Sequence, residues 1–506
     1  MMMSFSTLAS VSITWSLIGY SLAFGPGNGD AAPFIGNTHF GFFDSRDRIR
    51  DGTLVPEHAF MMFQLMFAII TAAVISGSVA GRMKLWAWLV FSTIWNFLVY
   101  IPLARWVFYS GGWLAQWGVL DFAGGIPVET ASGVSSLVLA YWLDRWKLKK
   151  RYPSTATTSI NHTNSNNISE HLLLHRQESQ EIPLVPSFDP SLNLEGDDNP
   201  TTDTKDGHHL KPHNVPFILM GAGLLFFGWF GFNAGSALAS GYLSSRAFAN
   251  THLAAAAAMV GWAVSEMIWN GKRVPHPITG KEKFIWGTPT AIGCATGVVV
   301  GLVAITPACG FVSQMIAILI GFTTSPICFW AHHLITKIGI DDTLGCFPGH
   351  GVAGMFGIIM TGFFASTDEG SPSNGLVYGE PSLLGKQIVA ILVGIGVCII
   401  GTTLSYGITV VIGYLFHSSL LIPAKTANVD LHLLGEQAYV YVDDANHIIK
   451  STSTNNQDNR RTRAQSILTS LLTTLQQSNH EIDAQKINSL LSSLQSPRTE
   501  PIIAVH

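Results

Sequence analysis

Charged residues are scarce in this chain. Only 12% of its 506 residues are Asp, Glu, Lys or Arg, about half the fraction of a soluble domain. The net charge of −4 gives no indication of nucleic-acid binding. The five cysteines show neither metal-ligand spacing nor a disulfide pattern. No basic segment precedes the first apolar stretch, so we expect no cleaved signal peptide.

The chain is instead rich in long apolar segments. Hydrophobic residues make up 48% of the chain, and its 49 glycines suit closely packed membrane helices. A bilayer core of about 30 Å needs about 20 apolar residues per helix. Ten segments qualify, near residues 4–24, 56–80, 85–108, 121–143, 215–238, 252–270, 286–305, 311–335, 346–365 and 386–416. We predict an all-α polytopic membrane protein without strands, because an open sheet leaves backbone groups unpaired in lipid.

Basic residues predict the orientation of these segments. They follow the even-numbered ones, as Arg82, Lys84, Arg145, Lys147, Lys149, Lys150, Arg151, Lys272, Arg273, Lys281, Lys283 and Lys337. Those ends, and both termini, are therefore expected in the cytoplasm. The three arginines of residues 44–51 are an exception on the outer side.

Four regions follow from this pattern. Residues 1–151 and 213–417 are predicted to hold the two sets of membrane helices, and residues 152–212 a disordered cytoplasmic loop. Residues 418–506 form a cytoplasmic tail, in which residues 464–477 have the spacing of an amphipathic helix.

Two carboxylates stand in the fourth segment, in LDFAGGIPVETASG (120–133). Asp121 lies at its outer end, where an acid either caps the helix or serves a site. Glu129 follows eight residues later, about 12 Å deeper at 1.5 Å per residue. A charged acid in the hydrocarbon costs several kcal/mol, so it faces a cavity, pairs, or takes up a proton. The alternative is a hydrogen-bonded packing role.

His350 in the ninth segment is expected at a similar depth, counted from the opposite face. It is either a satisfied core histidine or, with Glu129, half of a proton relay. Aromatic residues supply the third element. Phe63 and Phe67 are four apart, and Phe232 precedes Ser236 by four. Phenyl faces hold cations and a hydroxyl accepts a hydrogen bond, although each ring alone also fits a core or lipid position.

Several stretches carry a resemblance to a known family. LDFAGG (120–125), GWFGFNAGSA (228–237), ITPACGFV (305–312) and the IDD and HGV of residues 340–352 resemble the ammonium transporter (Amt/Mep/Rh) family, more its Amt/Mep branch. The match runs from about residue 10 to 416, apart from the inserted loop. It implies an Amt-like bundle of two inverted five-helix halves, a homotrimer in the plasma membrane, and transport rather than enzymatic chemistry, with no metal or organic cofactor.

The resemblance assigns an outer ammonium site. Asp121 resembles the aspartate that supports this site, Ser236 its hydroxyl acceptor, and Phe63 its phenyl wall. The aromatic lid falls at Phe108 or Tyr109, because the loop spacing does not decide between them.

The resemblance also assigns a conduction path. Phe67 and Phe232 resemble a stacked gate below the outer site. His350 matches the second of two pore histidines, and Glu129 stands where the first usually is. The pseudo-two-fold of the family fold relates these two residues, so we expect them to meet at the midplane. Ammonia would pass the gate, and the proton would travel by the Glu–His pair.

Three departures from the family pattern leave alternatives open. The family has eleven spans, and its first one has no counterpart among the ten expected here. Gly345 replaces an aspartate, and the tail stretch NVDLHLLGEQAY (428–439) alters the family's regulatory motif. The alternatives are a non-conducting ammonium sensor or structural subunit of the same fold, and an Rh-like gas channel.

Overall fold

Helices dominate the computed structural model of the chain, which describes residues 2–38, 48–151, 214–275 and 282–422. These residues belong to one compact unit, Met1–Lys425. The predictions made for the loop 152–212, for the tail motif 428–439 and for the helix 464–477 lie outside the described residues.

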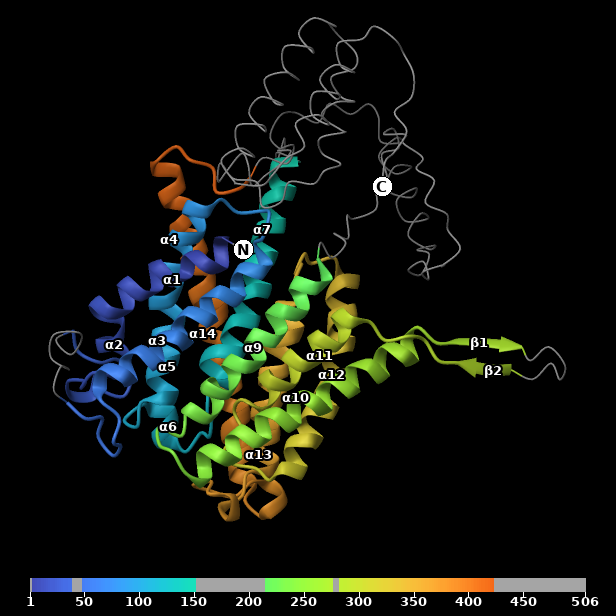
Figure 1. Ribbon diagram of the computed structural model, residues 1–506. Helices are drawn as coiled ribbons and strands as arrows, with labels where there is room; N and C mark the ends of the chain where they lie inside the picture. The colour runs from blue at the N-terminus through green and yellow to red at the C-terminus, as the bar shows by residue number, and fades with distance from the viewer. Residues whose placement is uncertain (1, 39–47, 152–213, 276–281, 423–506) are drawn as a thin grey trace, which may run out of the picture. The chain divides into compact units, whose positions relative to one another are not determined.

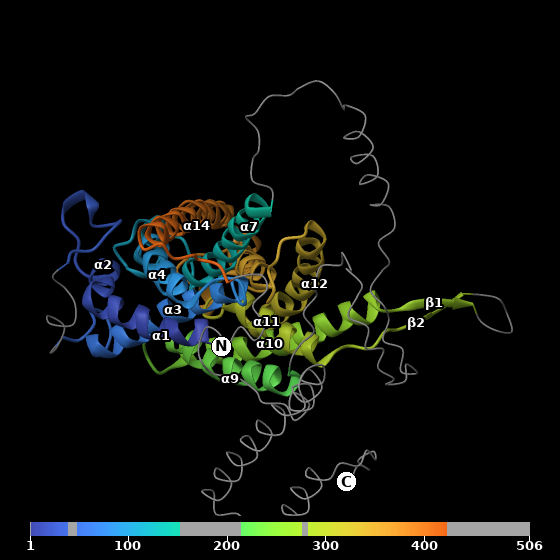
Figure 2. The ribbon, with the colours of Figure 1, turned by 90° about the horizontal axis from the view of Figure 1, so that it is seen from above.

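The first half contains seven numbered α-helices and five shorter helical turns. These are α1 (Met2–Thr14), η1 (Trp15–Gly19), α2 (Tyr20–Phe24), η2 (Gly29–Ala31), α3 (Glu57–Ile75), η3 (Ser76–Ser78), α4 (Leu85–Trp95), η4 (Asn96–Tyr100), α5 (Ile101–Phe108), α6 (Trp113–Trp117), η5 (Gly125–Thr130) and α7 (Ala131–Arg151). In Figures 1 and 2, α1 to α5 gather on one side of the bundle, coloured blue.

The second half contains the remaining helices and two strands. These are α9 (Val215–Gly235), α10 (Tyr242–Trp269), β1 (Lys272–Pro275), β2 (Glu282–Ile285), α11 (Ala291–Ile305), α12 (Gln314–Ile338), η7 (Phe347–Val352), α13 (Ala353–Phe364), η8 (Thr367–Glu369), η9 (Leu376–Tyr378) and α14 (Pro381–Leu415). Helices α9 to α12 lie together on the other side, whereas α14 packs back against α4 and α7 of the first half.

All ten segments predicted to span the membrane are helical. Eight helices in the described part of the chain are long and apolar enough to cross a bilayer. The fourth predicted segment is the run of η5 into α7, and the seventh is the shorter α11, with 15 residues. The predicted class, an all-α polytopic membrane protein, is confirmed.

Helix α10 begins at Tyr242 rather than near residue 252. The predicted segment leaves out the first turns of α10, because they are polar and lack an apolar run. Side chains of these turns nevertheless have partners elsewhere in the bundle. Arg246 Nε lies 3.0 Å from Glu369 Oε2. Asn250 Nδ2 donates to the carbonyls of Cys309 and Val312, both at 2.8 Å. Because the charge of Arg246 is paired and the Asn250 amide group donates two hydrogen bonds, the helix extends beyond its apolar stretch.

The prediction of no strands is wrong at one connection. Strands β1 and β2 form an antiparallel hairpin between α10 and α11. The argument against strands applies to the hydrocarbon core, where unpaired backbone groups find no water. A hairpin between two membrane helices lies beyond that limit.

The same local structure occurs once in each half of the chain. Asp121 precedes Glu129 by eight residues, and Asp342 precedes His350 by eight. Each stretch contains a π-helical turn, η5 or η7. A left-handed glycine precedes each turn: φ is 118° at Gly124 and 63° at Gly345. This conformation favours glycine and explains the departure at position 345.

The two repeats cross closely, since α7 packs against η7 and α13 packs against η5. Glycines at the crossing points make this close approach possible. A Cβ added to Gly133 would lie 2.0 Å from the backbone nitrogen of Gly351. A Cβ added to Gly354 would lie 2.6 Å from Cβ of Glu129. Any larger residue at these positions would force the two halves apart, and with them the two ionisable side chains that they carry.

We therefore expect Gly133→Ala to destabilise the protein by at least about 1–3 kcal/mol, because backbone cannot yield as a side chain does. The matched control is Gly396→Ala in α14, where an added Cβ meets nothing within 4 Å. Thermal unfolding of both variants in detergent tests this. Equal melting temperatures for the two variants would contradict the close crossing.

An ion cluster around the buried Arg82 also joins the halves. Arg82 Nη1 lies 2.9 Å from Asp144 Oδ1 and 3.3 Å from Asp341 Oδ2. Arg82 also donates to the backbone carbonyls of Ser78 and Asp341. Its partners thus come from α7 in the first half and from the segment before η7 in the second. This cluster holds that segment, and so η7, against the first half.

Candidate functional site

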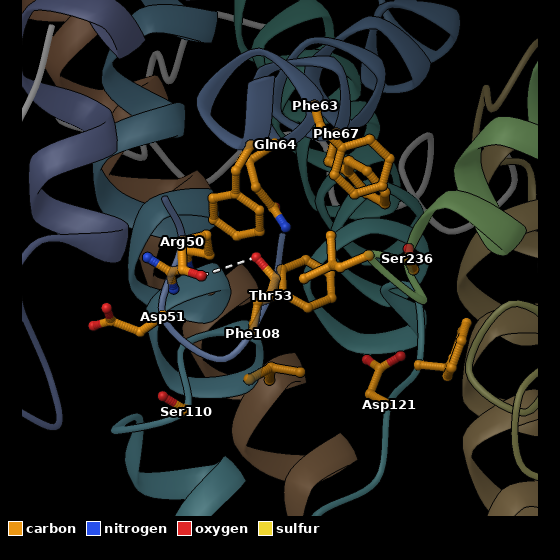
Figure 3. Close-up of a pocket in the computed structure, with 14 residues that line it drawn as sticks. Arg50, Asp51, Thr53, Phe63, Gln64, Phe67, Phe108, Ser110, Asp121 and Ser236 are labelled. Carbon is orange, nitrogen blue, oxygen red and sulfur yellow. Dashed lines mark hydrogen bonds between the residues drawn. The ribbon is translucent and has the colours of Figure 1, made fainter. Parts of the chain in front are cut away.

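The structure brings five of the predicted site residues into one pocket of about 260 Å³. They are Phe63, Phe67, Phe108, Asp121 and Ser236 (Figure 3). They come from α3, α5, the segment before η5, and the end of α9. A water molecule occupies about 30 Å³ of liquid, so the pocket has ample room for a small cation with part of its hydration shell.

Phe67 is the centre of a cluster of phenyl rings. Its ring centroid lies 4.8 Å from that of Phe63, 5.9 Å from Phe108 and 4.2 Å from Phe232. Phe67 is only 1% exposed. Phe232 packs behind it without lining the pocket, so Phe67 and Phe232 together close the inner end. The planes of the Phe67 and Phe232 rings are tilted by 31° to each other.

The structure distinguishes the two lid candidates. Phe108 lines the pocket, whereas Tyr109 is absent from the described lining. The Arg105 guanidinium lies 3.6 Å from the centroid of the Tyr109 ring. That guanidinium is itself fixed by donating to the carbonyls of Gly25 and Ala32. Tyr109 is therefore held outside the pocket, and the geometry favours Phe108.

Asp121 is both a helix cap and a pocket residue. Its Oδ1 accepts hydrogen bonds from the backbone N–H groups of Gly124 and Gly125, at 2.8 and 2.7 Å. Its Oδ2 accepts one from Ile126 at 2.8 Å. Asp342 caps η7 in the same way, through Cys346 and Phe347. The cap holds the Asp121 carboxylate at the pocket wall.

Ser236 ends α9 at the pocket. Its Oγ donates to the carbonyl of Phe232 at 2.8 Å, which leaves its lone pairs free to accept. Two residues on, Leu238 also lines the pocket and has φ of 53°, an uncommon value for a residue other than glycine. Backbone strain of this kind is often found at ligand sites.

Gln64 is a pocket residue that the sequence analysis missed. It is 6% exposed, and its Oε1 has no hydrogen-bond partner among the described residues. Figure 3 shows the Gln64 side chain reaching toward Thr53, with its amide nitrogen as the visible end. The signal was available: Gln64 is the single polar side chain in AFMMFQLMFAII (59–70). A buried carbonyl oxygen without a partner is costly unless a ligand or water satisfies it.

We expect Gln64→Leu to raise the half-saturation concentration for a bound cation about tenfold. A hydrogen bond to a charged group contributes about 1.5–3 kcal/mol, and Leu keeps the volume without the acceptor. Concentration-dependent uptake of radiolabelled methylammonium measures this, with Met66→Leu on the exposed face of α3 as the control. An unchanged half-saturation concentration in Gln64→Leu would remove Gln64 from the site.

The pocket mouth carries charges of both signs. Arg50 lines it but forms an ion pair with Glu57 at 3.2 Å and lies 4.3 Å from the ring centroid of Phe60. Its positive charge is thus compensated, while Asp51 and Asp121 also line the pocket. The net field favours a cation.

Glu129 and His350 make the contact that the sequence predicts. Glu129 Oε2 lies 2.8 Å from His350 Nδ1. Glu129 is 1% exposed, and its second oxygen, Oε1, has no hydrogen-bond partner among the described residues. An unpaired buried oxygen costs about 1–3 kcal/mol. Neither Glu129 nor His350 belongs to the described lining of the outer pocket.

Comparisons with known proteins agree with this geometry. The family model described as "Ammonium Transporter Family" matches residues 1–168 and 196–439. An ammonium transporter of Bacillus subtilis (strain 168) is 37% identical over 448 residues, which cover 87% of this chain and 89% of the relative. The crystal structure of Candida albicans Mep2 has a TM-score of 0.64 and 27% identity, covering 86% of this chain and 81% of that one.

A third similarity concerns the fold alone. A solved "Sensor Amt Protein" is 22% identical to this chain, with a TM-score of 0.57 and coverage of 83% and 85%. The family model spans both halves of the bundle and the pocket between them. Together with the Bacillus relative, this match shows that the chain belongs to the Ammonium Transporter Family.

Proposed function

We propose that this protein conducts ammonium across the plasma membrane, with deprotonation at the outer pocket and a Glu–His pair that carries the proton. The observation that carries the proposal is the buried Glu129–His350 contact, in which one carboxylate oxygen remains without a partner. An ionisable pair buried within a membrane protein is otherwise costly and rarely retained without a function.

The cation binds first, in the outer pocket. The phenyl faces of Phe63 and Phe108 attract it, while Ser236 and Gln64 offer oxygen acceptors. Asp121 contributes negative charge from a position fixed by three backbone hydrogen bonds. Ammonium, lipid and further copies of the chain are the partners that this function requires.

The proton and the neutral molecule then separate. A bare cation cannot cheaply cross an apolar gate, because its hydration is lost without replacement. Ammonia passes Phe67 and Phe232, and the proton moves along Glu129 and His350. Net transport therefore carries positive charge. This is a transport process rather than catalysis, and its path needs no cofactor.

Two further parts of the proposal concern assembly and orientation. We propose a homotrimer with one path in each subunit, since α9 exposes Phe217, Met220 and Leu224, which a neighbouring copy or lipid must cover. The ends followed by basic residues, including the tail, face the cytoplasm.

Uptake of methylammonium into cells that lack their own ammonium transporters tests the proposed function. We expect saturable uptake and restored growth on low ammonium. Correctly targeted trimers that take up no methylammonium, yet bind it, would favour the sensor reading instead. Uptake that follows only the neutral amine as pH changes would favour a gas channel.

A further inference from the structure

The hairpin between α10 and α11 has no role in the proposed path. Both views show β1 and β2 projecting sideways from the bundle (Figures 1 and 2). Every residue of β2 is exposed. An isolated two-stranded hairpin is at best marginally stable in water, so a surface is expected to support this one.

The base of the hairpin is fixed to the end of α10. The backbone N–H of Gly287 donates to the carbonyl of Met267 at 2.9 Å. The Phe284 ring packs directly on Gly271, where an added Cβ would lie 2.2 Å from Cζ. Phe284 also contacts Trp286 edge-on, with centroids 5.2 Å apart. The hairpin is therefore held in one direction rather than free to swing.

Its two faces differ in charge. Lys272 pairs with Ile285 and Val274 pairs with Lys283 across the strands, and paired residues point to the same face. This face, named the lysine face, has two lysines and two exposed aliphatic side chains but no acid. The opposite face has Arg273 and Glu282, which form an ion pair at 3.7 Å, and Phe284.

Interfacial tryptophans mark the level at which the hairpin leaves the bundle. Trp269 ends α10, Trp286 follows β2, and Trp330 in α12 lies 5.0 Å from Trp269 between ring centroids. All three are exposed. Exposed tryptophans are typical of the membrane–water boundary. They indicate that the hairpin leaves the bundle near the level of the lipid headgroups.

We propose that the lysine face docks on the anionic lipid surface of the membrane that holds the protein. Val274 and Ile285 enter the interface, and Lys272 and Lys283 contact the negative headgroups. The inference goes beyond the transport function and requires nothing of the pore. Two lysines near an anionic surface raise the equilibrium constant for docking about 30-fold.

The test uses the full chain in nanodiscs of phosphatidylcholine, with or without phosphatidylserine. An environment-sensitive nitrobenzoxadiazole label is placed on the lysine face through Val274→Cys, in a Cys294→Ala background. The matched control carries the label on the opposite face through Glu282→Cys with Arg273→Gln, which leaves the net charge unchanged.

We expect a blue shift of the label at position 274 only with phosphatidylserine, reversed by high salt and lost in Lys272→Gln/Lys283→Gln. The label at position 282 should keep its emission. A blue shift at position 274 that is equal in both lipids would overturn the proposal and indicate a second copy of the chain as the occupant. A water-exposed label in both lipids would overturn it as well.

Discussion

Asp121→Asn is expected to reduce methylammonium uptake at least tenfold, about 1.4 kcal/mol, while the protein still folds. Asn and Asp are about equally good as helix N-caps, so the amide retains most of the cap seen at Gly124 and Gly125. It loses the negative charge at the pocket wall and the acceptor for the Ile126 N–H, because an amide nitrogen only donates. Asp121→Ala should lose uptake too and also about 1 kcal/mol of stability.

Asp342→Ala provides the comparison for the cap alone. Asp342 caps η7 through two backbone N–H groups and lies outside the described pocket lining. The change in melting temperature of Asp342→Ala measures the stability that is lost with a cap, while the outer pocket keeps its charge. Surface amount and trimer content must be measured beside uptake for each variant. Asp121→Asn with normal surface amount and unchanged uptake would show that Asp121 is only a cap.

Glu129→Gln is expected to abolish most of the ammonium-evoked current with little effect on folding. Gln has the size of Glu and still reaches His350 Nδ1, now 2.8 Å from the carboxylate, but it does not exchange a proton. Glu129→His places the family's usual pair in the path, so it should conduct with a shifted pH optimum. Currents on supported membranes between about pH 5 and 8 compare the three proteins, since imidazole titrates in that range.

The interpretation depends on both the size of the ammonium-evoked current and its dependence on pH. If Glu129→Gln carries the wild-type current with the wild-type pH dependence, then Glu129 is a packing residue. The contact with Gly354 makes this variant informative. Because Gly354 has no side chain, Glu129 packs directly against it. Gln introduces no new atom at that crossing, so a loss of current cannot be attributed to steric displacement of the halves.

Sequence predicted the membrane helices for a physical reason that holds generally, because apolar length identifies a span without knowledge of its neighbours. The Glu–His contact followed from the family resemblance, whose pseudo-two-fold relates the two positions, and the distance of 2.8 Å agrees. For Asp121 the sequence left a cap and a site role as alternatives, because a sequence does not show which backbone groups a carboxylate meets.

The failures share a different cause. Gln64 was passed over because its neighbours Phe63 and Phe67 explained α3 as an aromatic face, and only the fold shows that Oε1 is unpaired. The choice between Phe108 and Tyr109 depends on Arg105, which holds Tyr109 away. The hairpin falls between two spans, where rules for lipid no longer apply. Each case is decided by long-range contacts.

Charge movement by the purified protein tests the central claim most directly. Wild-type trimers in proteoliposomes are given an ammonium concentration step on a supported membrane. Uptake of radiolabelled methylammonium is followed in the same preparation. The account predicts a transient inward positive current that saturates with ammonium and accompanies uptake. Methylammonium uptake without any current in the wild-type protein would contradict a proton path through Glu129 and His350.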